Sequence, residues 1–356
     1  MKSKLLLLVF FFILLSVTSC KKQDPLPIEE DPFPATGEYP KLLTQDNFII
    51  GNTFFSPDGK HIAFYSIKYT FDPYVSWSPH ELWTMRSNGF DLRRVILEKS
   101  IYDLTIPTMI CWNSDSKSMM VHIKDKHWDY KSEIWQVTVT GERTKLYAPD
   151  FRLEKLSYSP DKSKLAYMIQ GPNPPTGLPV YKLYVANTDF SDSIRIEKGL
   201  IWEYEWQGDS KSLIYSFYDR PNLNYDLWKS SSDGTSKSRF SQTPVNEEHI
   251  TVSTDGKHMA YYVSNSVYVS PTAQFAPQKI MDNARNPAWV PGRNYLLVIN
   301  EQTDGKGNYW TESWIIDMQG NIIRKFPKGV RGISFYSDGH HFIYNSEDSI
   351  WLDYLP

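Results

Sequence analysis

The sequence has little cysteine, little net charge and no recognisable catalytic motif. Its 356 residues include 2 cysteines and have a formal net charge of −3. A charge balance this mild and dispersed argues against nucleic acid as a partner, because nucleic-acid binding needs a concentrated basic surface. The G-x-S-x-G, H-E-x-x-H, C-x-x-C and phosphate-loop motifs are all absent. The sequence therefore predicts no catalytic residue.

Only one long apolar run is present, and it lies at the N-terminus. Residues 5–15 are all apolar, a run well short of the about 20 residues that span a bilayer. Because a short basic segment precedes the run, residues 1–19 are predicted to be a signal peptide. Residues 17–20, Val-Thr-Ser-Cys, resemble the lipobox of bacterial lipoproteins, which implies that Cys20 is lipidated. The alternative is a soluble secreted protein that is cleaved nearby.

The lipidated cysteine is followed by a segment that favours an extended chain. Residues 20–39 contain four prolines and few large apolar groups, so we expect a semi-rigid tether rather than part of a core. Lipidation of Cys20 would leave Cys111 as the only thiol, and no intramolecular disulfide could form. Cys111 lies in an apolar string, where we expect it to be buried as a small hydrophobic residue.

Beyond residue 39 the sequence is periodic. The clearest unit is FSPDGKHIAF at Phe55, and further copies begin at Trp112, Tyr158, Trp206, Val252, Trp289 and Phe335. They recur about every 47 residues, the period of β-propeller blades. Within the unit, proline presets φ, aspartate accepts hydrogen bonds from backbone amides and glycine adopts positive φ, which favours a hairpin turn. A third apolar segment follows each copy and a fourth follows six of them, so we predict four strands per unit.

The two ends of the periodic region complement each other. The seventh unit ends after its third strand, whereas residues 41–44 stand alone before the first unit. We therefore predict an all-β fold: a single seven-bladed β-propeller of four-stranded blades over residues 40–356, closed by pairing of residues 41–44 with the strand near Trp351. A six-bladed alternative would omit the copy at Trp289 and leave an interval of nearly two periods.

The hairpin SPDG-K-x-I-A-F, followed by x-I-W or L-Y-V, resembles TolB-like, WD40-like (PD40-type) propeller repeats. The resemblance extends over essentially the whole mature chain. Such repeats occur in TolB-like scaffolds, in the propellers of dipeptidyl peptidase IV-like enzymes and in a few propeller lyases. The resemblance therefore implies the fold rather than one function.

One face of the predicted propeller has the longer loops. In a propeller the loops between second and third strands share a face with the blade-to-blade connections; we call it the long-loop face. The opposite face holds the Ser-Pro-Asp-Gly-type turns, and we call it the turn face. Five long loops are rich in aromatic and charged residues, which is typical of binding surfaces, although such rings also pack loops onto a rim. We predict a ligand-binding face that contains Tyr74, Trp77, His127, Trp128, Tyr130, Tyr218, Arg220, Tyr225, Tyr309 and Trp310.

A metal site is not expected. His122 and His127 lie near Asp125 and Asp129 in the sequence, but no second cluster completes a ligand set. No cofactor is predicted either.

These features favour a non-enzymatic binding module. We expect a monomer, exported and lipid-anchored at the bacterial outer membrane, which faces the periplasm or the cell surface and takes a protein or saccharide ligand. The alternative is a carbohydrate-active lyase or glycoside hydrolase that uses paired acids at the mouth of the propeller. Candidate acids are Asp72, Asp129, Asp219, Asp226 and Asp304.

Overall fold

The fold is taken from a computed structural model of the chain. It describes residues 33, 39–44, 49–67, 80–96, 105–125, 132–149, 152–171, 178–219, 223–346 and 349–356. The chain divides into two units, Met1–Asp31 and Pro32–Pro356. The first unit, with the predicted signal peptide and Cys20, lies outside the described residues.

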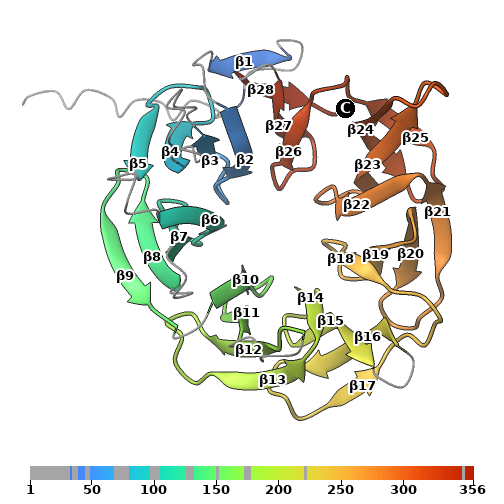
Figure 1. The fold of residues 1–356 in the computed structure, drawn as a ribbon. Helices are drawn as coiled ribbons and strands as arrows, with labels where there is room; N and C mark the ends of the chain where they lie inside the picture. Colours follow the sequence, from blue (N-terminus) through green and yellow to red (C-terminus); the bar gives the residue numbers. More distant parts are fainter. Residues whose placement is uncertain are drawn as a thin grey trace, which may run out of the picture. The chain divides into compact units, whose positions relative to one another are not determined.

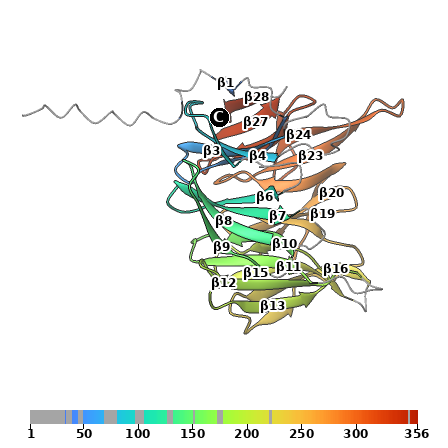
Figure 2. The same ribbon diagram turned by 60° about the vertical axis from the view of Figure 1, so that its left-hand side comes forward.

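The described part of the second unit is a seven-bladed β-propeller (Figure 1). Its 28 strands form seven four-stranded antiparallel sheets that stand around a central axis. Viewed from the side, neighbouring sheets pack face to face (Figure 2). The predicted fold class is therefore confirmed. The part of the chain that the structure describes contains no helix able to cross a membrane.

Blades 1 to 6 each run from an inner strand to an outer strand in chain order. Blade 1 is β2 (Ile49–Phe55), β3 (His61–Ile67), β4 (His80–Arg86) and β5 (Arg93–Ile96). Blade 2 is β6 (Thr105–Trp112), β7 (Ser118–Asp125), β8 (Ser132–Thr138) and β9 (Arg143–Tyr147). Blade 3 is β10 (Arg152–Tyr158), β11 (Lys164–Gln170), β12 (Tyr181–Asn187) and β13 (Ile194–Gly199).

Blades 4 to 6 repeat the arrangement. Blade 4 is β14 (Ile201–Trp206), β15 (Ser212–Asp219), β16 (Asn224–Ser231) and β17 (Lys237–Arg239). Blade 5 is β18 (Glu248–Val252), β19 (His258–Val263), β20 (Ser266–Pro271) and β21 (Gln278–Asp282). Blade 6 is β22 (Ala284–Trp289), β23 (Tyr295–Thr303), β24 (Tyr309–Asp317) and β25 (Ile322–Lys325).

The seventh blade joins the two ends of the propeller. It contains β26 (Arg331–Phe335), β27 (His341–Ser346), β28 (Ser349–Tyr354) and, on the outside, β1 (Lys41–Thr44). Lys41 pairs with Leu352, and Leu42 pairs with Trp351. The predicted closure is confirmed. The copy at Trp289 also forms a complete blade, so the seven-bladed count holds.

Part of the segment predicted to be a tether also contacts blade 7. Phe33 stacks on His341 with ring centroids 4.1 Å apart, and Tyr39 stacks on Tyr354 at 5.9 Å. Phe33 also lies close to Gly59, in the turn between β2 and β3. The chain therefore enters the propeller at the turn face.

The predicted turn chemistry holds the turn face together. In the first turn, Ser56 Oγ donates to Asp58 Oδ1 at 2.6 Å, the same carboxylate accepts from the amide of Lys60, and Gly59 has a φ of 73°. Turns of neighbouring blades also touch. The amide of Asp58 donates to Ser116 Oγ at 3.1 Å, and the turns of blades 3 and 4 repeat this bond. The turns therefore connect neighbouring blades.

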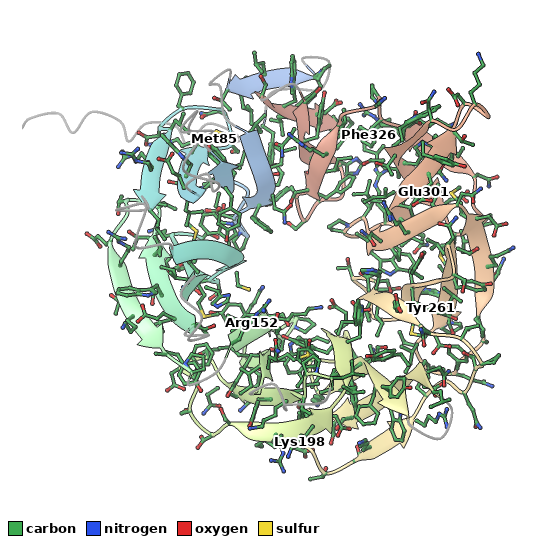
Figure 3. All side chains as sticks on the ribbon, in the orientation of Figure 1. Met85, Arg152, Lys198, Tyr261, Glu301 and Phe326 are labelled. Carbon is green, nitrogen blue, oxygen red and sulfur yellow. The ribbon has the colours of Figure 1, made fainter. Side chains whose placement is uncertain are left out.

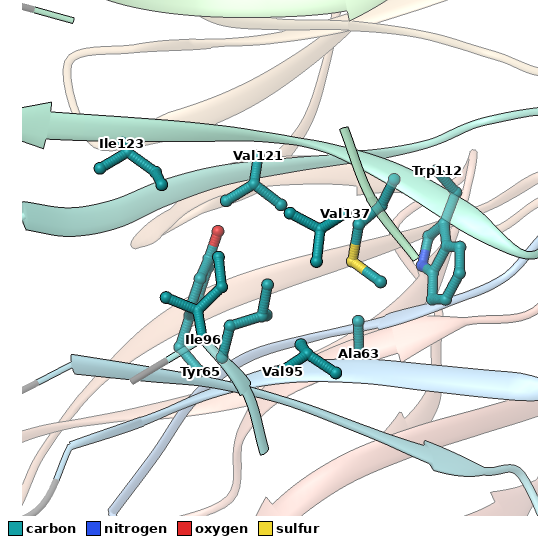
Figure 4. Packing of buried hydrophobic residues seen from close by; sticks show 10 residues of the cluster. Ala63, Tyr65, Val95, Ile96, Trp112, Val121, Ile123 and Val137 are labelled. Atoms are coloured by element: carbon teal, nitrogen blue, oxygen red, sulfur yellow. The ribbon is translucent and has the colours of Figure 1, made fainter. Parts of the chain in front are cut away.

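Apolar clusters between adjacent blades form the core. Between blades 1 and 2, Leu82, Val121 and Val137 are fully buried (Figure 4). Burial of one such side chain contributes about 1.5–3 kcal/mol. Cys111 faces blade 3, where its Sγ lies 3.3 Å from the carbonyl oxygen of Leu156. Burial raises the pKa of this thiol to about 11, so it is un-ionised at neutral pH, as expected of a packing residue.

Every inner strand has a β-bulge near its start, on the long-loop face. The pairing register shifts between Leu153 and Lys155 in β10 and between Ile201 and Glu203 in β14, and each of the other five inner strands shifts at a similar place. A bulge inserts an extra residue and redirects its side chain, and bulges are frequent beside binding sites. In blades 3 and 4 the extra residues are Glu154 and Trp202.

Candidate functional site

Four of the ten predicted face residues belong to the described part of the chain. They are Tyr218, Tyr225, Tyr309 and Trp310, and the structure places them at the ends of strands rather than in loops. The other predicted residues, Tyr74, Trp77, His127, Trp128, Tyr130 and Arg220, lie outside the described residues, as does Cys20.

The predicted residues of blade 6 do not join those of blade 4. Tyr309 and Trp310 begin β24 in a long hairpin that extends from the propeller body (Figure 2). Tyr309 is 78% exposed. Trp310 Nε1 donates to Glu312 Oε1 at 2.9 Å, and Lys328 lies over its ring. Its indole is therefore already engaged within the blade.

Tyr218 and Tyr225 do come together, and a third ring joins them. The two residues are direct partners in the pairing of β15 with β16, with ring centroids 5.3 Å apart at 63°. Trp202, the bulge residue of β14, lies 6.1 Å from Tyr225 at 64° and is 51% exposed. We call these three rings the aromatic wall. It stands on the long-loop face of blade 4.

The local backbone fixes the aromatic wall. The two-stranded pairing places Tyr225 opposite Tyr218, and the amide of Tyr225 donates to Asn246 Oδ1 at 2.9 Å. Side chains along β14 would normally point to the two faces of the sheet in turn, but the bulge interrupts this alternation between Ile201 and Tyr204. Ile201 is 1% exposed, and Tyr204 is fully buried. Without the bulge, Trp202 would share the buried face of Tyr204.

Acidic and phenolic groups approach the wall from its flanks. The pKa of Tyr225 is raised by burial and then by Tyr181, Glu248 and Tyr218. The pKa of Tyr181 is raised by burial and by Glu154. Glu154 pairs with Arg152 at 2.7 Å, and Arg152 lies at the inner rim of blade 3 (Figure 3). Further rings and charged groups from blades 3 and 5 therefore lie beside the aromatic wall.

A lysine joins blades 3 and 4 beneath this surface. Lys155 Nζ donates to the carbonyl oxygen of Tyr204 at 2.6 Å and to Glu205 Oε1 at 2.7 Å, and it lies 5.0 Å from the centroid of the Tyr204 ring. Burial alone would lower the pKa of Lys155, but Glu205 and Glu203 outweigh burial and raise it. Lys155 is therefore held charged between the two blades.

Glu203 connects blade 4 to blade 5. Its Oε1 accepts a hydrogen bond from the amide of Ile250 at 2.9 Å. Burial raises the pKa of Glu203 to about 7, although Lys155 and the amide of Ile250 oppose the shift. This carboxyl group therefore titrates near neutral pH.

Blades 5 and 6 add a histidine and an ion pair. Burial lowers the pKa of His249, which has a φ of 53° within the bulge of β18. Arg285 Nη1 lies 3.3 Å from Glu301 Oε1, whereas Arg285 Nε is buried and has no hydrogen-bond partner among the described residues. This arginine keeps a donor unsatisfied.

Two of the five acids proposed for catalysis have partners within their own blades. Asp226 is fully buried, bonded to Arg239 and to the amide of Thr243. Asp304 accepts bonds from Lys306 and Asn308 within the tip of the β23–β24 hairpin. Asp226 therefore stabilises blade 4, and Asp304 shapes a turn. Asp219 ends β15, while Asp72 and Asp129 lie outside the described residues.

Three solved structures place this architecture among known folds. Oligogalacturonate lyase in complex with manganese has a TM-score of 0.64 and 13% identity over 88% of this chain and 92% of the lyase chain. TolB from Acinetobacter baumannii has a TM-score of 0.50 and 16% identity over 74% of this chain and 62% of the TolB chain. The β-propeller domain of the Trilobed protease from Pyrococcus furiosus has a TM-score of 0.59 and 13% identity over 88% of this chain and 97% of that domain. The fold is a TolB-like β-propeller. No protein-family model and no curated protein matches the sequence.

The closure of the ring differs from that of one of these neighbours. The Pyrococcus furiosus domain has an open velcro topology, whereas here β1 pairs with β28. Within the described residues of this chain, no three His, Cys, Asp or Glu side chains gather as a metal site. Identities this low establish the fold alone.

The sequence alone did not indicate Trp202, Lys155 or Glu203. Trp202, Tyr204 and Trp206 alternate along β14, a pattern that predicts three buried rings. The only available signal was the pair of adjacent large residues Ile201 and Trp202, which breaks strict alternation at the start of the strand.

Proposed function

We propose that this TolB-like propeller is a non-enzymatic binding module that takes a protein or saccharide ligand on its long-loop face. We also propose that it is exported and anchored to the bacterial outer membrane through a lipid on Cys20. The observation that supports binding is the aromatic wall, in which Trp202 is exposed and Tyr218 and Tyr225 are half-buried, beside the charged inner strands of blades 3 to 6. Large rings beside polar groups are the usual anchors of recognition surfaces.

The arrangement of the two faces agrees with this proposal. The turns of the opposite face bond to one another, as between Asp58 and Ser116, and so contribute to closure. Phe33 joins the propeller beside Gly59 on that same turn face. The described contacts of Phe33 and of the turns therefore lie on the face opposite the aromatic wall.

Binding of the full-length protein to a defined panel tests the proposal. The panel contains peptidoglycan fragments, neutral and acidic oligosaccharides, and peptides from envelope proteins, measured by calorimetry in detergent. We expect at least one ligand to bind, and the Trp202→Ala, Tyr225→Ala double variant to lose about tenfold or more in affinity, as at other aromatic hot spots.

The matched control is Phe90→Ala. Phe90 is 71% exposed in the turn between β4 and β5, on the opposite face. Its loss should leave binding unchanged. A ligand that binds equally to the wild type, the double variant and the control would place the binding surface elsewhere.

One observation favours a second function, carbohydrate cleavage. Glu203, with a pKa of about 7, and Glu205, paired with Lys155, lie on the same inner strand. Glycosidic cleavage requires two carboxyl groups, one of which donates a proton. Product formation from an oligosaccharide that is abolished by Glu203→Gln, without loss of folding, would favour the enzyme. Binding without product formation would favour the binding module.

A further inference from the structure

Side-chain hydrogen bonds hold the connection between blades 4 and 5 in place. This connection comprises residues 240–247, which lie between the outer strand β17 and the inner strand β18 and form neither helix nor strand. Asn224 Nδ2, at the start of β16, donates to the carbonyl oxygens of Thr243 and Val245 at 2.6 and 3.0 Å. The connection is therefore fastened to the end of β16 that lies on the long-loop face.

The same connection supports the aromatic wall. The amide of Tyr225 donates to Asn246 Oδ1 at 2.9 Å, and the carbonyl oxygen of Tyr225 accepts from the amide of Glu247 at 3.2 Å. The carbonyl oxygen of Glu247 in turn accepts from Ser216 Oγ of β15 at 2.9 Å. Both backbone polar groups of Tyr225 thus bond to the connection, so a movement of residues 246 and 247 would displace this part of the wall.

A buried carboxyl group closes the connection on itself. Glu247 is 1% exposed, its Oε2 accepts from Ser241 Oγ at 3.0 Å, and its Oε1 contacts Thr243 Oγ1. Thr243 Oγ1 also donates to the carbonyl oxygen of Val245 at 3.1 Å. A protonated Glu247 fits this network, because Thr243 Oγ1 can accept from the carboxyl O–H and still donate to Val245.

The surroundings of Glu247 disfavour its ionised form. Thr243 bonds to two carboxyl groups, through its hydroxyl to Glu247 and through its amide to the fully buried Asp226 of β16 at 3.2 Å. Asp226 is paired with Arg239 of β17, and Tyr261 of β19 faces Glu247 from blade 5. Burial, and to a lesser extent Asp226, raises the pKa of Glu247 to about 7, although its hydrogen bonds and Arg239 oppose the shift. Ionisation of Glu247 would place a second buried carboxylate beside Asp226.

We propose that Glu247 is a proton-operated switch: its protonated carboxyl group holds residues 240–247 against β16, and loss of the proton releases the connection together with Tyr225. The switch belongs to the fold of this chain, and only its effect on ligand binding rests on the proposed function. An ionised carboxylate gains solvation when the connection opens. Opening should therefore become easier as pH rises from 4.5, the ordinary pKa, to about 7, and no easier above that value.

Hydrogen–deuterium exchange of the full-length protein, without ligand, tests the switch. Wild type and Glu247→Gln are compared by mass spectrometry at each pH from about 5 to about 8, so that intrinsic exchange rates cancel. Glutamine keeps the hydrogen-bonding capacity of the protonated carboxyl group but cannot ionise. For peptides that contain Tyr225 or residues 240–247, the ratio of wild-type to variant exchange should grow by up to about tenfold per pH unit as far as pH 7 and then level off.

Two further variants identify the group that titrates. Glu203→Gln is the matched control, because it removes another buried carboxyl group with a pKa of about 7 that lies outside the connection. It should leave the pH dependence of residues 240–247 unchanged. Thr243→Val removes the hydroxyl that contacts Glu247 Oε1, a contact that lowers the pKa of Glu247, so the midpoint should move to higher pH. Residues 207–211, the β14–β15 turn of the same blade, serve as an internal reference.

The possible outcomes separate the switch from the proposed function. A ratio that stays constant over the whole pH range, or a pH dependence that Glu203→Gln abolishes, would overturn the switch. If Glu247→Gln does not fold, the wild-type profile relative to the reference turn and its displacement by Thr243→Val decide the question, and a profile that Thr243→Val leaves in place overturns the switch. If exchange follows the expected profile but no ligand of the panel binds, the switch stands and the binding proposal fails.

Discussion

The inner strands of this propeller differ sharply between one side of the ring and the other. In blades 1 and 2 the inner strands IIGNTFF and TIPTMICW contain no charged residue. In blades 3 to 7 the inner strands RLEKLSY, IWEYEW, EHITV, ARNPAW and RGISF contain arginine, lysine, glutamate or histidine. Both kinds of strand build complete blades, so ring closure does not require the charges.

Charges near an interior must overcome a desolvation penalty, and they persist where a contact or a ligand compensates for it. In blades 3 to 5, Lys155 and Glu203 obtain that compensation from the backbone of the next blade. The side of the ring with these contacts is also the side with the aromatic wall. The charged side is therefore the side on which we propose the binding surface.

The inner strands of blades 2 and 4 each contain a tryptophan, Trp112 and Trp202. Substitution of the buried Trp112 should have the largest effect on the free energy of unfolding. Trp112 in blade 2 is 7% exposed, and its Nε1 donates to the carbonyl oxygen of Phe54 at 3.4 Å. Trp112→Ala should lower the free energy of unfolding by about 3–5 kcal/mol, because it leaves a cavity between two blades. Urea denaturation measures this change. A loss below about 1 kcal/mol would show that the core between blades 1 and 2 repacks easily.

The pH dependence of stability should originate on the charged side. Glu203 binds a proton in the folded state up to a pKa of about 7, but in the unfolded chain only up to 4.5. Between these values the folded state binds more protons, so the stability from this group is complete below pH 4.5 and declines as pH rises to 7. The decline should reach at most about 3 kcal/mol. Urea denaturation at several pH values should show a shallower decline for Glu203→Gln.

Glu247 provides a comparison for the titration. Burial raises its pKa to about 7 as well, and its carboxylate accepts a bond from Ser241 Oγ at 3.0 Å. Glu247→Gln should therefore remove a second, separate part of the decline. An unchanged pH profile in both variants would mean that neither carboxyl group titrates near neutral pH.

Replacing a charged inner-strand residue of blade 3 by its uncharged counterpart in blade 2 should have a smaller effect on stability. Met109 in blade 2 follows the bulge of its inner strand, as Lys155 does in blade 3. Lys155→Met should destabilise the protein by about 1–2 kcal/mol, since the carbonyl oxygen of Tyr204 and the carboxylate of Glu205 lose their donor. Lys155→Arg, which keeps the charge, should recover part of this loss in the same thermal or urea experiment. A neutral or stabilising Lys155→Met would show that these two contacts of Lys155 add nothing to the stability of the fold.

The sequence predicted the features that local residue patterns determine, but not those that depend on strand register. The Asp-Gly turns and the apolar triplets recur at fixed spacing, so blade number and closure by Lys41 to Thr44 followed from the sequence. Tyr218 and Tyr225 were predicted as residues of a long loop, whereas the structure places them at the ends of β15 and β16. Trp202 was not predicted, because its exposure depends on which residue of β14 is extra in the pairing with β15. That register results from tertiary packing, and no local pattern encodes it.

The smallest predicted effect is the most informative for function. Trp202→Ala should change the free energy of unfolding by no more than about 0.5 kcal/mol, because the ring is 51% exposed and no hydrogen bond of the described residues depends on it. Because Trp202 lies in a group of three neighbouring rings, a small effect on stability would agree with a role in binding. Parallel urea curves for Trp112→Ala and Trp202→Ala measure the contrast. If Trp202→Ala instead costs as much as Trp112→Ala, the ring belongs to the core, and the aromatic wall is a packing feature of blade 4 rather than a binding surface.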